Sequence, residues 1–130
     1  MTLLLDSCTF LRLISDFERI PAPTLEHIEV QPLVVSTITL WEILIKIGKG
    51  RLHIDTDGQG MGRFWQTHCN ALDARVLAVE PDDVLHLPSL PTIHRDPFDR
   101  LLICQAIEHG LAIVTPDSHI RQYPIKTIWD

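Results

Sequence analysis

The chain has 130 residues, of which 45% are hydrophobic and 22% charged. This length and composition are typical of one compact domain with its own core, not of a disordered or low-complexity segment. The formal net charge of −6, from 11 basic and 17 acidic residues, argues against a protein that coats nucleic acid through a broadly basic surface. It does not exclude a nuclease, because divalent cations held by clustered carboxylates would supply the positive field that a phosphate needs. We therefore expect a single domain over residues 1–130.

The N-terminal residues and the cysteines indicate a cellular compartment. The apolar run Leu3 to Leu5 is interrupted at Asp6, too early for a signal peptide or a membrane-spanning segment. The three cysteines are widely separated and odd in number, which favours reduced thiols packed in the core over a disulfide framework. We expect a cytoplasmic protein that does not associate with a membrane.

Strand and helix patterns alternate over the first half of the chain. The predicted elements are a strand at 2–5, a helix at 7–14, a weak helix at 24–31, a strand at 33–36, a helix at 36–47 and, after a loop at 54–62, a helix at 61–72. Asp6 or Ser7 is expected to cap the first helix, and Ser36 or Thr37 the third. Gly48 is a typical end for that third helix.

The alternation continues in the second half. The predicted elements are a strand at 75–79, a short helix at 81–87, an irregular segment at 88–95, a helix at 97–109, a strand at 111–115, a short helix near 117–121 and a strand at 126–128. Strands separated by helices imply an α/β sandwich around a mainly parallel sheet. In such sheets ligands bind outside the carboxyl ends of the strands. Asp6 and Asp117 each come directly after a predicted strand, so both are expected at that edge.

Glu42 lies in an otherwise apolar helix. Between Ile38 and Ile47 the polar residues are Thr39, Glu42 and Lys46, which form a narrow stripe at helical spacing. One interpretation places Glu42 in a crevice. The other is a surface pair with Lys46, four residues away, worth only about 0.3–0.5 kcal/mol. The periodicity does not separate the two.

The stretch HRDPFDR, residues 94–100, also has two interpretations. Asp96 followed by Pro97 is typical of a helix cap and the first helical residue, and Asp99 then occupies the third helical position. Both carboxylates would stay ionised at a helix N-terminus. An ionised carboxylate at a crevice is also what Mg²⁺ or Mn²⁺ requires, so capping and metal binding are compatible. No role is assigned to His94.

Together the acidic positions resemble a known family. Asp6 after a leucine strand, Glu42 in WEILIKIGKGRL, Asp99 in FDRLLICQAIEHG and Asp117 in TPDSHI resemble the four acids of PIN-domain ribonucleases, with VapC-type toxins of bacterial toxin–antitoxin systems as the nearest likeness. The resemblance runs from Leu3 to Ile128, and four motifs in order are more specific than any one of them. It implies a PIN-like three-layer α/β/α sandwich.

The resemblance also implies an activity. It would be an endoribonuclease dependent on Mg²⁺ or Mn²⁺, with Asp6, Glu42, Asp99 and Asp117 as the catalytic and metal-binding acids and Asp6 as the foremost direct ligand. In the two-metal form, one ion activates the attacking water and the other stabilises the departing 3′ oxygen. RNA that is single-stranded or looped is the expected substrate. The family further implies a homodimer and a small antitoxin whose segment occupies the groove.

Several further residues are expected to support these acids. The hydroxyls of Ser7 and Thr115 could orient ligands or bound water, although capping and strand-end hydrogen bonds explain them equally well. Asp96 is expected to be a helix cap first and a contributor to the metal site second. Basic residues that could contact phosphates are Arg12, Lys46, Lys49, Arg51, Arg95 and Arg100. Cys8 and Arg12 stand where related toxins often have His and Trp, which affects the expected substrate-facing surface more than the metal pocket.

Three alternatives remain beside this hypothesis. The first is a PIN nuclease that processes RNA and is not a toxin. The second is a non-enzymatic Mg²⁺-binding receiver module, but such modules need an adjacent acidic pair after the first strand, and Asp6 stands alone. The third is a PIN fold that only binds a partner and has lost its activity, which the retention of all four acids speaks against. A calcium EF-hand at residues 55–66 is rejected because Gln66 stands where the bidentate glutamate should be, so a loop is the better interpretation.

Overall fold

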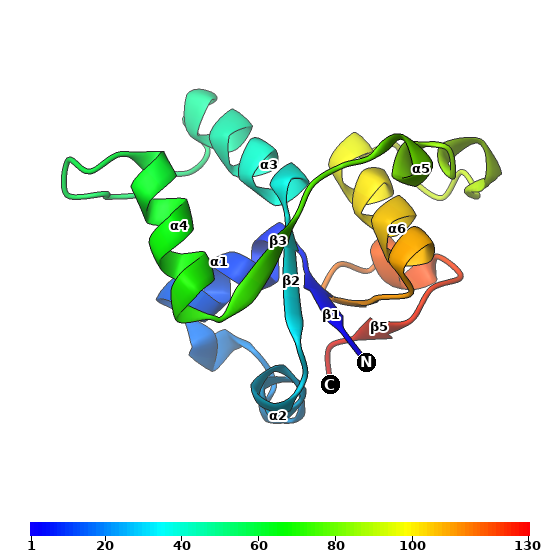
Figure 1. Cartoon of the computed structure of the whole chain (residues 1–130), viewed down its shortest axis with the longest axis horizontal. Helices are drawn as coiled ribbons and strands as arrows, with labels where there is room; N and C mark the ends of the chain where they lie inside the picture. Colours follow the sequence, from blue (N-terminus) through cyan, green and yellow to red (C-terminus); the bar gives the residue numbers. More distant parts are fainter.

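The computed structural model describes residues 1–130, built around a five-stranded sheet that is parallel throughout. Its strand order is β3-β2-β1-β4-β5 (Figure 1). The strands are β1 (Leu3–Leu5), β2 (Leu33–Ser36), β3 (Ala74–Leu77), β4 (Ala112–Val114) and β5 (Thr127–Ile128). The helices are α1 (Ser7–Ser15), α2 (Ala22–Val30), α3 (Thr37–Gly48), α4 (Met61–Ala71), α5 (Pro81–Val84) and α6 (Pro97–His109), with 3₁₀ turns at Phe17–Arg19, Leu87–Ser89 and Ile120–Gln122.

The side chains of β1 alternate between two cores. Leu3 and Leu5 belong to one cluster with Phe10 of α1 and Trp65 of α4, whereas Leu4 belongs to a second cluster that includes Leu102 of α6. Successive residues of a strand point to opposite faces, so a run of three leucines feeds both cores. Figure 1 shows α1 and α4 on one side of the sheet and α5 and α6 on the other. The predicted three-layer α/β/α sandwich is confirmed.

Two predicted helices differ from the structure. The helix predicted at 81–87 is split, with α5 ending at Val84 and a 3₁₀ turn following at Leu87. Pro88 explains the break, because it has no N–H to donate and its ring would clash with the carbonyl four residues earlier. The helix predicted near 117–121 is wrong: only a 3₁₀ turn forms there, at Ile120–Gln122. The Asp117 side chain caps the preceding turn by accepting from the backbone of Ile120.

Gly110 brings the chain from α6 back to the sheet. It follows the last residue of α6 and has φ 64°, in the left-handed region, where glycine is not strained. The next residue, Leu111, donates its N–H to the carbonyl of Ala106. The helix therefore ends in a tight reversal, and β4 begins at Ala112, directly beside β1.

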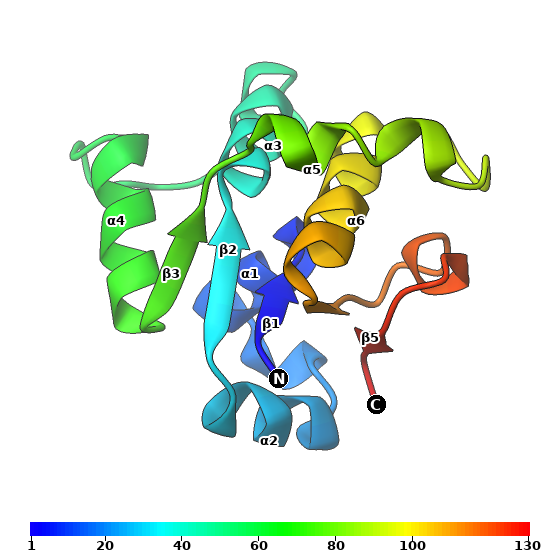
Figure 2. The same cartoon turned by 45° about the vertical axis from the view of Figure 1, so that its right-hand side comes forward.

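The central strand β1 lies where the chain changes direction across the sheet. It pairs with β2 on one side and with β4 on the other, and the crevice at the carboxyl ends of such neighbouring strands is the usual ligand site of an open α/β sheet. Figure 2 shows α3 and α6 near the ends toward which the strand arrows point. An edge-to-face contact between Trp41 of α3 and Phe98 of α6, with ring centroids 4.8 Å apart, joins these two helices. No helix combines the length and the apolar character needed to cross a bilayer.

Candidate active site

A cavity of about 390 Å³ lies at this edge of the sheet. Its lining residues are Asp6, Ser7, Cys8, Arg12, Glu42, Lys46, Asp96, Asp99, Pro116 and Asp117. The four acids predicted from the sequence are all among them, together with Asp96. They come from the ends of β1 and β4, from α3 and from the start of α6, so the fold brings together side chains that are far apart in the sequence.

Asp6 is the most enclosed of these acids, with 4% of its surface exposed. Its Oδ1 accepts from the backbone N–H of Thr9 at 2.8 Å and caps α1, while its Oδ2 accepts from the Thr115 hydroxyl. Burial raises the pKa of Asp6 because it disfavours the charged carboxylate. The hydrogen bonds from Thr115 and Thr9 oppose this rise. Asp6 is thereby held in one orientation at the floor of the pocket.

Thr115 connects Asp6 to Asp117. Its hydroxyl donates to Asp6 and accepts from the Asp117 backbone N–H at 3.0 Å. The Asp117 carboxylate uses Oδ1 to accept from the backbone N–H groups of His119 and Ile120, at 2.8 and 3.0 Å. One fully buried hydroxyl therefore orders the ends of both central strands, and Asp117 Oδ2 makes no hydrogen bond within the chain.

Glu42 lies in a crevice, as the first interpretation drawn from the sequence had it, and pairs with Lys46 without being a surface residue. It is 6% exposed and lines the cavity, and its Oε2 also pairs with Lys46 Nζ at 2.9 Å. Its Oε1 is buried and has no hydrogen-bond partner. Burial opposes the charged form of Lys46, but the hydrogen bond and charge of Glu42 prevail and raise the pKa of that ammonium. A buried carboxylate oxygen without a partner is costly and is a suitable ligand for a hard cation.

Asp96 and Asp99 have different roles at the start of α6. Asp96 Oδ1 accepts from the backbone N–H groups of Phe98 and Asp99, at 2.9 and 3.1 Å, and so caps the helix. Burial raises the pKa of Asp99 to about 7. A hydrogen bond from His94 opposes the rise, and the negative charges of Asp96, Asp117 and Glu42 add to it.

These side chains have the composition of a divalent-cation site but not yet its geometry. No three His, Cys, Asp or Glu side chains are grouped closely enough to hold an ion between them. The reason is that the carboxylates repel one another and are held by separate donors: Asp6 by Thr115, Glu42 by Lys46 and Asp99 by His94. The all-oxygen donor set and the unpartnered Glu42 Oε1 nevertheless fit Mg²⁺ or Mn²⁺.

The comparison with protein families decides what kind of domain this is. A family model described as the PIN domain matches residues 3–126, almost the whole chain. The chain belongs to the PIN-domain family. PIN domains are typically nucleases, which agrees with an acidic pocket at the carboxyl edge of the sheet. No curated protein matches the chain by sequence.

Solved structures similar to this PIN domain include several toxin–antitoxin complexes. VapBC2 from Rickettsia felis, bound to a DNA fragment from its promoter, has a TM-score of 0.70 at 16% identity, with all of both chains covered. DNA-bound VapBC from Salmonella typhimurium has a TM-score of 0.67 at 18% identity, covering 98% of this chain and 97% of the other. FitAcB from Neisseria gonorrhoeae has a TM-score of 0.63 at 15% identity, covering 97% and 96%. At these identities the likeness establishes the fold.

The basic residues that were predicted to contact phosphates divide into two groups. Arg12 and Lys46 line the acidic cavity of the PIN domain, whereas Lys49, Arg51, Arg95 and Arg100 do not. Arg95 is exposed, and Arg100 donates to the Pro91 carbonyl and to the Tyr123 hydroxyl. The fold therefore brings only the first group to the site.

A second hollow adjoins the acidic cavity. It shares Ser7, Cys8, Arg12 and Lys46 with the first and adds Arg19 and Arg51. Four of its ten lining residues are cationic and only Asp16 is acidic. In a protein of net charge −6, this groove is a local basic surface that leads directly into the acidic pocket.

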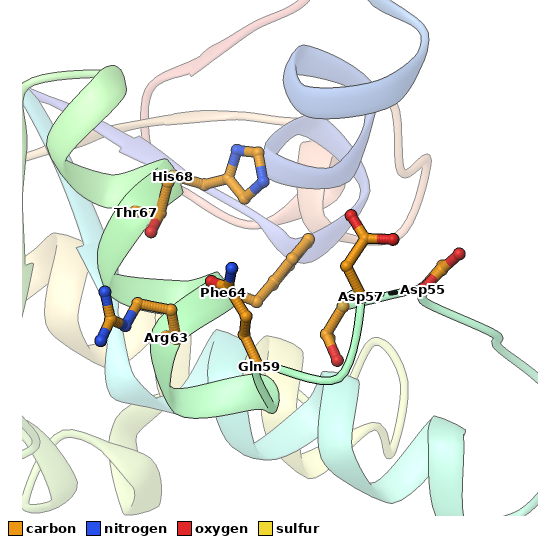
Figure 3. A pocket seen from close by; sticks show the side chains of 8 residues that line it. Asp55, Asp57, Gln59, Arg63, Phe64, Thr67 and His68 are labelled. Atoms are coloured by element: carbon orange, nitrogen blue, oxygen red, sulfur yellow. Dashed lines mark hydrogen bonds between the residues drawn. The ribbon is translucent and has the colours of Figure 1, made fainter.

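Figure 3 shows a separate polar cavity that contains none of the predicted site residues. It is lined by the loop between α3 and α4 and by the first turns of α4. Asp55 Oδ1 accepts from the backbone N–H of Asp57 at 2.9 Å, and the Thr56 hydroxyl accepts from that of Gly60. These side chains stabilise a turn, as expected for a loop and not for an EF-hand.

Two residues that order the acids have no signal in the sequence. Thr9 belongs to α1, where its backbone binds Asp6 and its hydroxyl donates to the Val114 carbonyl at 2.8 Å. His94 lies in the irregular segment before α6 and contacts Asp99 through its ring. The first looks like an ordinary helical threonine and the second has no regular spacing from its partner, so neither is marked by periodicity.

Proposed function

We propose that this PIN domain is an endoribonuclease dependent on Mg²⁺ or Mn²⁺ and the toxin of a toxin–antitoxin pair. The observation that carries the proposal is the acidic cavity, in which Asp6, Glu42, Asp99 and Asp117 converge from four segments of the chain. Crowded carboxylates in a low-dielectric pocket favour a bound divalent cation, because the cation removes their mutual repulsion. When bound, the metal would activate water and stabilise the departing oxygen of a phosphodiester.

The chain's own residues would hold and orient the reactants. Asp6, fixed by Thr115 and Thr9, offers a ligand that loses little freedom on binding. Glu42 presents its unpartnered oxygen from α3, and Asp99 and Asp117 line the same cavity from the start of α6 and from the segment after β4. The ammonium of Lys46 would be able to contact a phosphate once a cation takes its place beside Glu42.

The substrate is proposed to be a single RNA strand. The basic hollow supplies Arg12, Arg19, Lys46 and Arg51 beside the acids, so a strand could place consecutive phosphates on the cations and one phosphodiester over the carboxylates. An accessible, deformable strand suits such a path better than a duplex. Cys8 lines both hollows, but burial and the charge of Asp6 raise the pKa of its thiol, which argues against a role as nucleophile.

The toxin role rests on similarity and on an exposed apolar surface. Structures of this fold include VapBC and FitAcB complexes, which supports a small antitoxin as partner. The outer side of α3 leaves Trp41 52%, Leu44 43% and Ile45 37% exposed. An apolar group of this kind is typical of a protein contact surface, and it supports the proposed homodimer or antitoxin contact. A PIN nuclease that processes RNA outside a toxin–antitoxin pair is the second candidate.

The nuclease proposal is tested by incubating structured and unstructured RNA with the purified protein, with Mg²⁺, Mn²⁺ or EDTA. Asp6→Asn and Asp99→Asn should each lower metal-dependent cleavage by on the order of 100-fold or more. Asp55→Asn is the matched control, since it neutralises an exposed acid of the separate cavity in Figure 3, and should cleave as the wild type does. Robust cleavage by Asp6→Asn and Asp99→Asn would show that the site is wrong.

The toxin role needs its own test. A short reading frame directly upstream should encode a protein that copurifies with this chain and suppresses its cleavage of RNA. If no such neighbour exists while the nuclease activity is confirmed, the RNA-processing alternative is favoured.

A further inference from the structure

His94 lies behind the acidic pocket and contacts it through Asp99. Its side chain is 12% exposed, and both ring nitrogens have a partner: Nε2 lies 3.0 Å from Asp99 Oδ2 and Nδ1 lies 2.8 Å from the Tyr123 hydroxyl. The ring also stacks on His119, with centroids 5.1 Å apart and planes 13° from parallel. His94 does not line the cavity. Since neither nitrogen is free to face the pocket, the geometry excludes it as a direct metal ligand in this arrangement.

The hydrogen bonds around His94 have a defined direction. Arg100 donates to the Tyr123 hydroxyl oxygen at 3.0 Å, because a guanidinium can only donate. That leaves the hydroxyl proton of Tyr123, a buried residue, available for His94 Nδ1. In the neutral ring Nδ1 then accepts, so the ring proton is on Nε2, which faces the Asp99 carboxylate. When Asp99 is ionised, each group in the series Arg100, Tyr123, His94 and Asp99 therefore donates to the next.

Asp99 needs such a donor because of its surroundings. The charges of Asp96, Asp117 and Glu42 act on it, and like charges favour a rotamer that turns the carboxylate away from the pocket. The hydrogen bond from His94 engages Oδ2 and leaves Oδ1 without a hydrogen bond in the chain. An imidazole anchored at its far nitrogen and stacked on one face can supply this restraint, since its own rotation is blocked.

We propose that His94 is a positioning residue of the site, which holds Asp99 Oδ2 so that Oδ1 stays directed to a bound divalent cation, with Tyr123 and Arg100 fixing the ring in its donating tautomer. The inference rests on the proposed metal-dependent function of the pocket. It also links two of the acids, because His119, which stacks on His94, donates its backbone N–H to Asp117 Oδ1. Residues that orient a metal ligand in this way typically change metal affinity by about 10–100-fold when replaced.

Two amide substitutions at position 94 test whether Asp99 is held by the N–H donor of His94 or by the imidazole ring as a whole. His94→Gln places an amide N–H at the reach of Nε2 and can still donate to Asp99, whereas His94→Asn ends at the reach of Nδ1 and cannot. We expect the Kd for Mn²⁺, measured by calorimetry, to rise about 10-fold in His94→Asn and to recover most of the loss in His94→Gln. Tyr123→Phe, which removes the anchor of the ring, should lie between them.

His86→Asn is the matched control. It removes a histidine–carboxylate contact of the same kind, 2.8 Å from His86 Nε2 to Glu108 Oε1, which is away from the pocket. Its Mn²⁺ affinity should equal that of the wild type, and thermal unfolding of all variants shows that each is folded. Equal Mn²⁺ affinity in folded His94→Asn and wild type would overturn the proposal. So would His94→Gln binding as weakly as His94→Asn, because the ring and not its N–H would then matter.

A metal-free measurement distinguishes this inference from the proposed function. Crystal structures of the variants in EDTA should show Asp99 in its wild-type rotamer in His94→Gln and turned away in His94→Asn. Nitrogen NMR of the wild type should show the neutral ring of His94 protonated at Nε2. In Tyr123→Phe, the same measurement should show a mixture of the two neutral tautomers. If the wild type binds no Mn²⁺, the proposed function fails. An unchanged Asp99 rotamer in His94→Asn contradicts the positioning role whether or not metal binds.

Discussion

At the scale of single residues, the pocket concentrates unfavourable charge. Glu42 has a buried oxygen without a partner, and Asp99 has a pKa of about 7 because it is buried and surrounded by other acids. Such groups destabilise the folded chain when they are ionised. The site is thus expected to cost stability that a bound cation restores.

Replacing Asp99 with asparagine should stabilise the metal-free protein above neutral pH. The folded pKa of about 7 lies above the ordinary value of 3.8, so between these values the folded state binds more protons than the unfolded chain. Stability from this group therefore falls as pH rises from 4 to 7. We expect Asp99→Asn to raise the free energy of unfolding by on the order of 1–3 kcal/mol at pH 8.

The measurement is denaturant unfolding in EDTA at pH 4, 6 and 8. The gain from Asp99→Asn should shrink toward pH 4, where the wild-type carboxyl is protonated in the folded state, and saturating Mn²⁺ should reverse the order of the two proteins at pH 8. If the free energies of unfolding of the wild type and Asp99→Asn differ by the same amount at every pH, Asp99 is not the acid whose pKa is raised.

That the predicted acids lie close together was predictable, but the hydrogen bonds that connect them to other residues were not. Asp6 and Asp117 were expected at the carboxyl edge of the sheet because each follows a predicted strand, whereas Glu42 and Asp99 were assigned through the resemblance to PIN-domain ribonucleases; all four line the same cavity. The hydrogen bond from Thr115 to Asp6 joins two strand ends that are far apart in the sequence. The hydrogen bond from His94 to Asp99 starts in an irregular segment. No local period records such contacts, since they depend on how separate elements dock.

At the scale of elements, the start of α6 combines a structural and an electrostatic role in adjacent residues. Asp96 caps the helix through the backbone N–H groups of Phe98 and Asp99, and its charge also raises the pKa of Asp99. The cap aligns the first turn, so Asp99 at the third helical position faces the pocket.

Two substitutions at Asp96 should separate these roles. Asp96→Ala removes both cap and charge and is expected to lower the free energy of unfolding by about 1 kcal/mol. Asp96→Asn keeps an oxygen that can accept from the same N–H groups and should remain close to wild type. Thermal or urea unfolding of the two variants makes the comparison. Because both lose the same charge, equal destabilisation would mean that the cap is not what Asp96 contributes to the fold.

Most elements followed from local patterns. The apolar runs at β1 and β2 match the structure, and α6 begins at Pro97 and ends at His109 as predicted, because a Pro start and a Gly stop are strong signals. The errors fall where the signals conflict. Pro88 divides the helix predicted at 81–87. Near 117–121 the side chain of Asp117 caps a turn, and the predicted helix does not form.

At the scale of the whole molecule, charge is distributed unevenly. The chain has a net charge of −6, yet the groove beside the acids contains Arg12, Arg19, Lys46 and Arg51. Because the protein is acidic overall, most of its surface should bind RNA weakly. We expect the RNA that does bind to contact this groove. Affinity would then depend on salt in proportion to the number of phosphates that the groove contacts.

Removing one groove cation should lower that salt dependence. For Arg51→Ala, the slope of log Kd for single-stranded RNA against log salt concentration should become shallower by about 0.7–1. Arg75→Ala is the control, since Arg75 is exposed on the edge strand β3 and away from the groove. Fluorescence anisotropy measures both slopes in an Asp6→Asn background, which is chosen to prevent cleavage of the RNA. Equal slopes in the two variants would rule out the groove as the path of the strand.

The position of β1 has a consequence for how the molecule comes into being. Of the five strands of this sheet, β1 is synthesised before the others and becomes the centre, and its neighbour β4 and the Thr115 that binds Asp6 arrive 109 residues later. Asp6 therefore has no complete pocket until Asp117 has emerged from the ribosome. Under the proposed function, a nascent chain cannot cleave RNA until the segment that carries Thr115 and Asp117 has been translated.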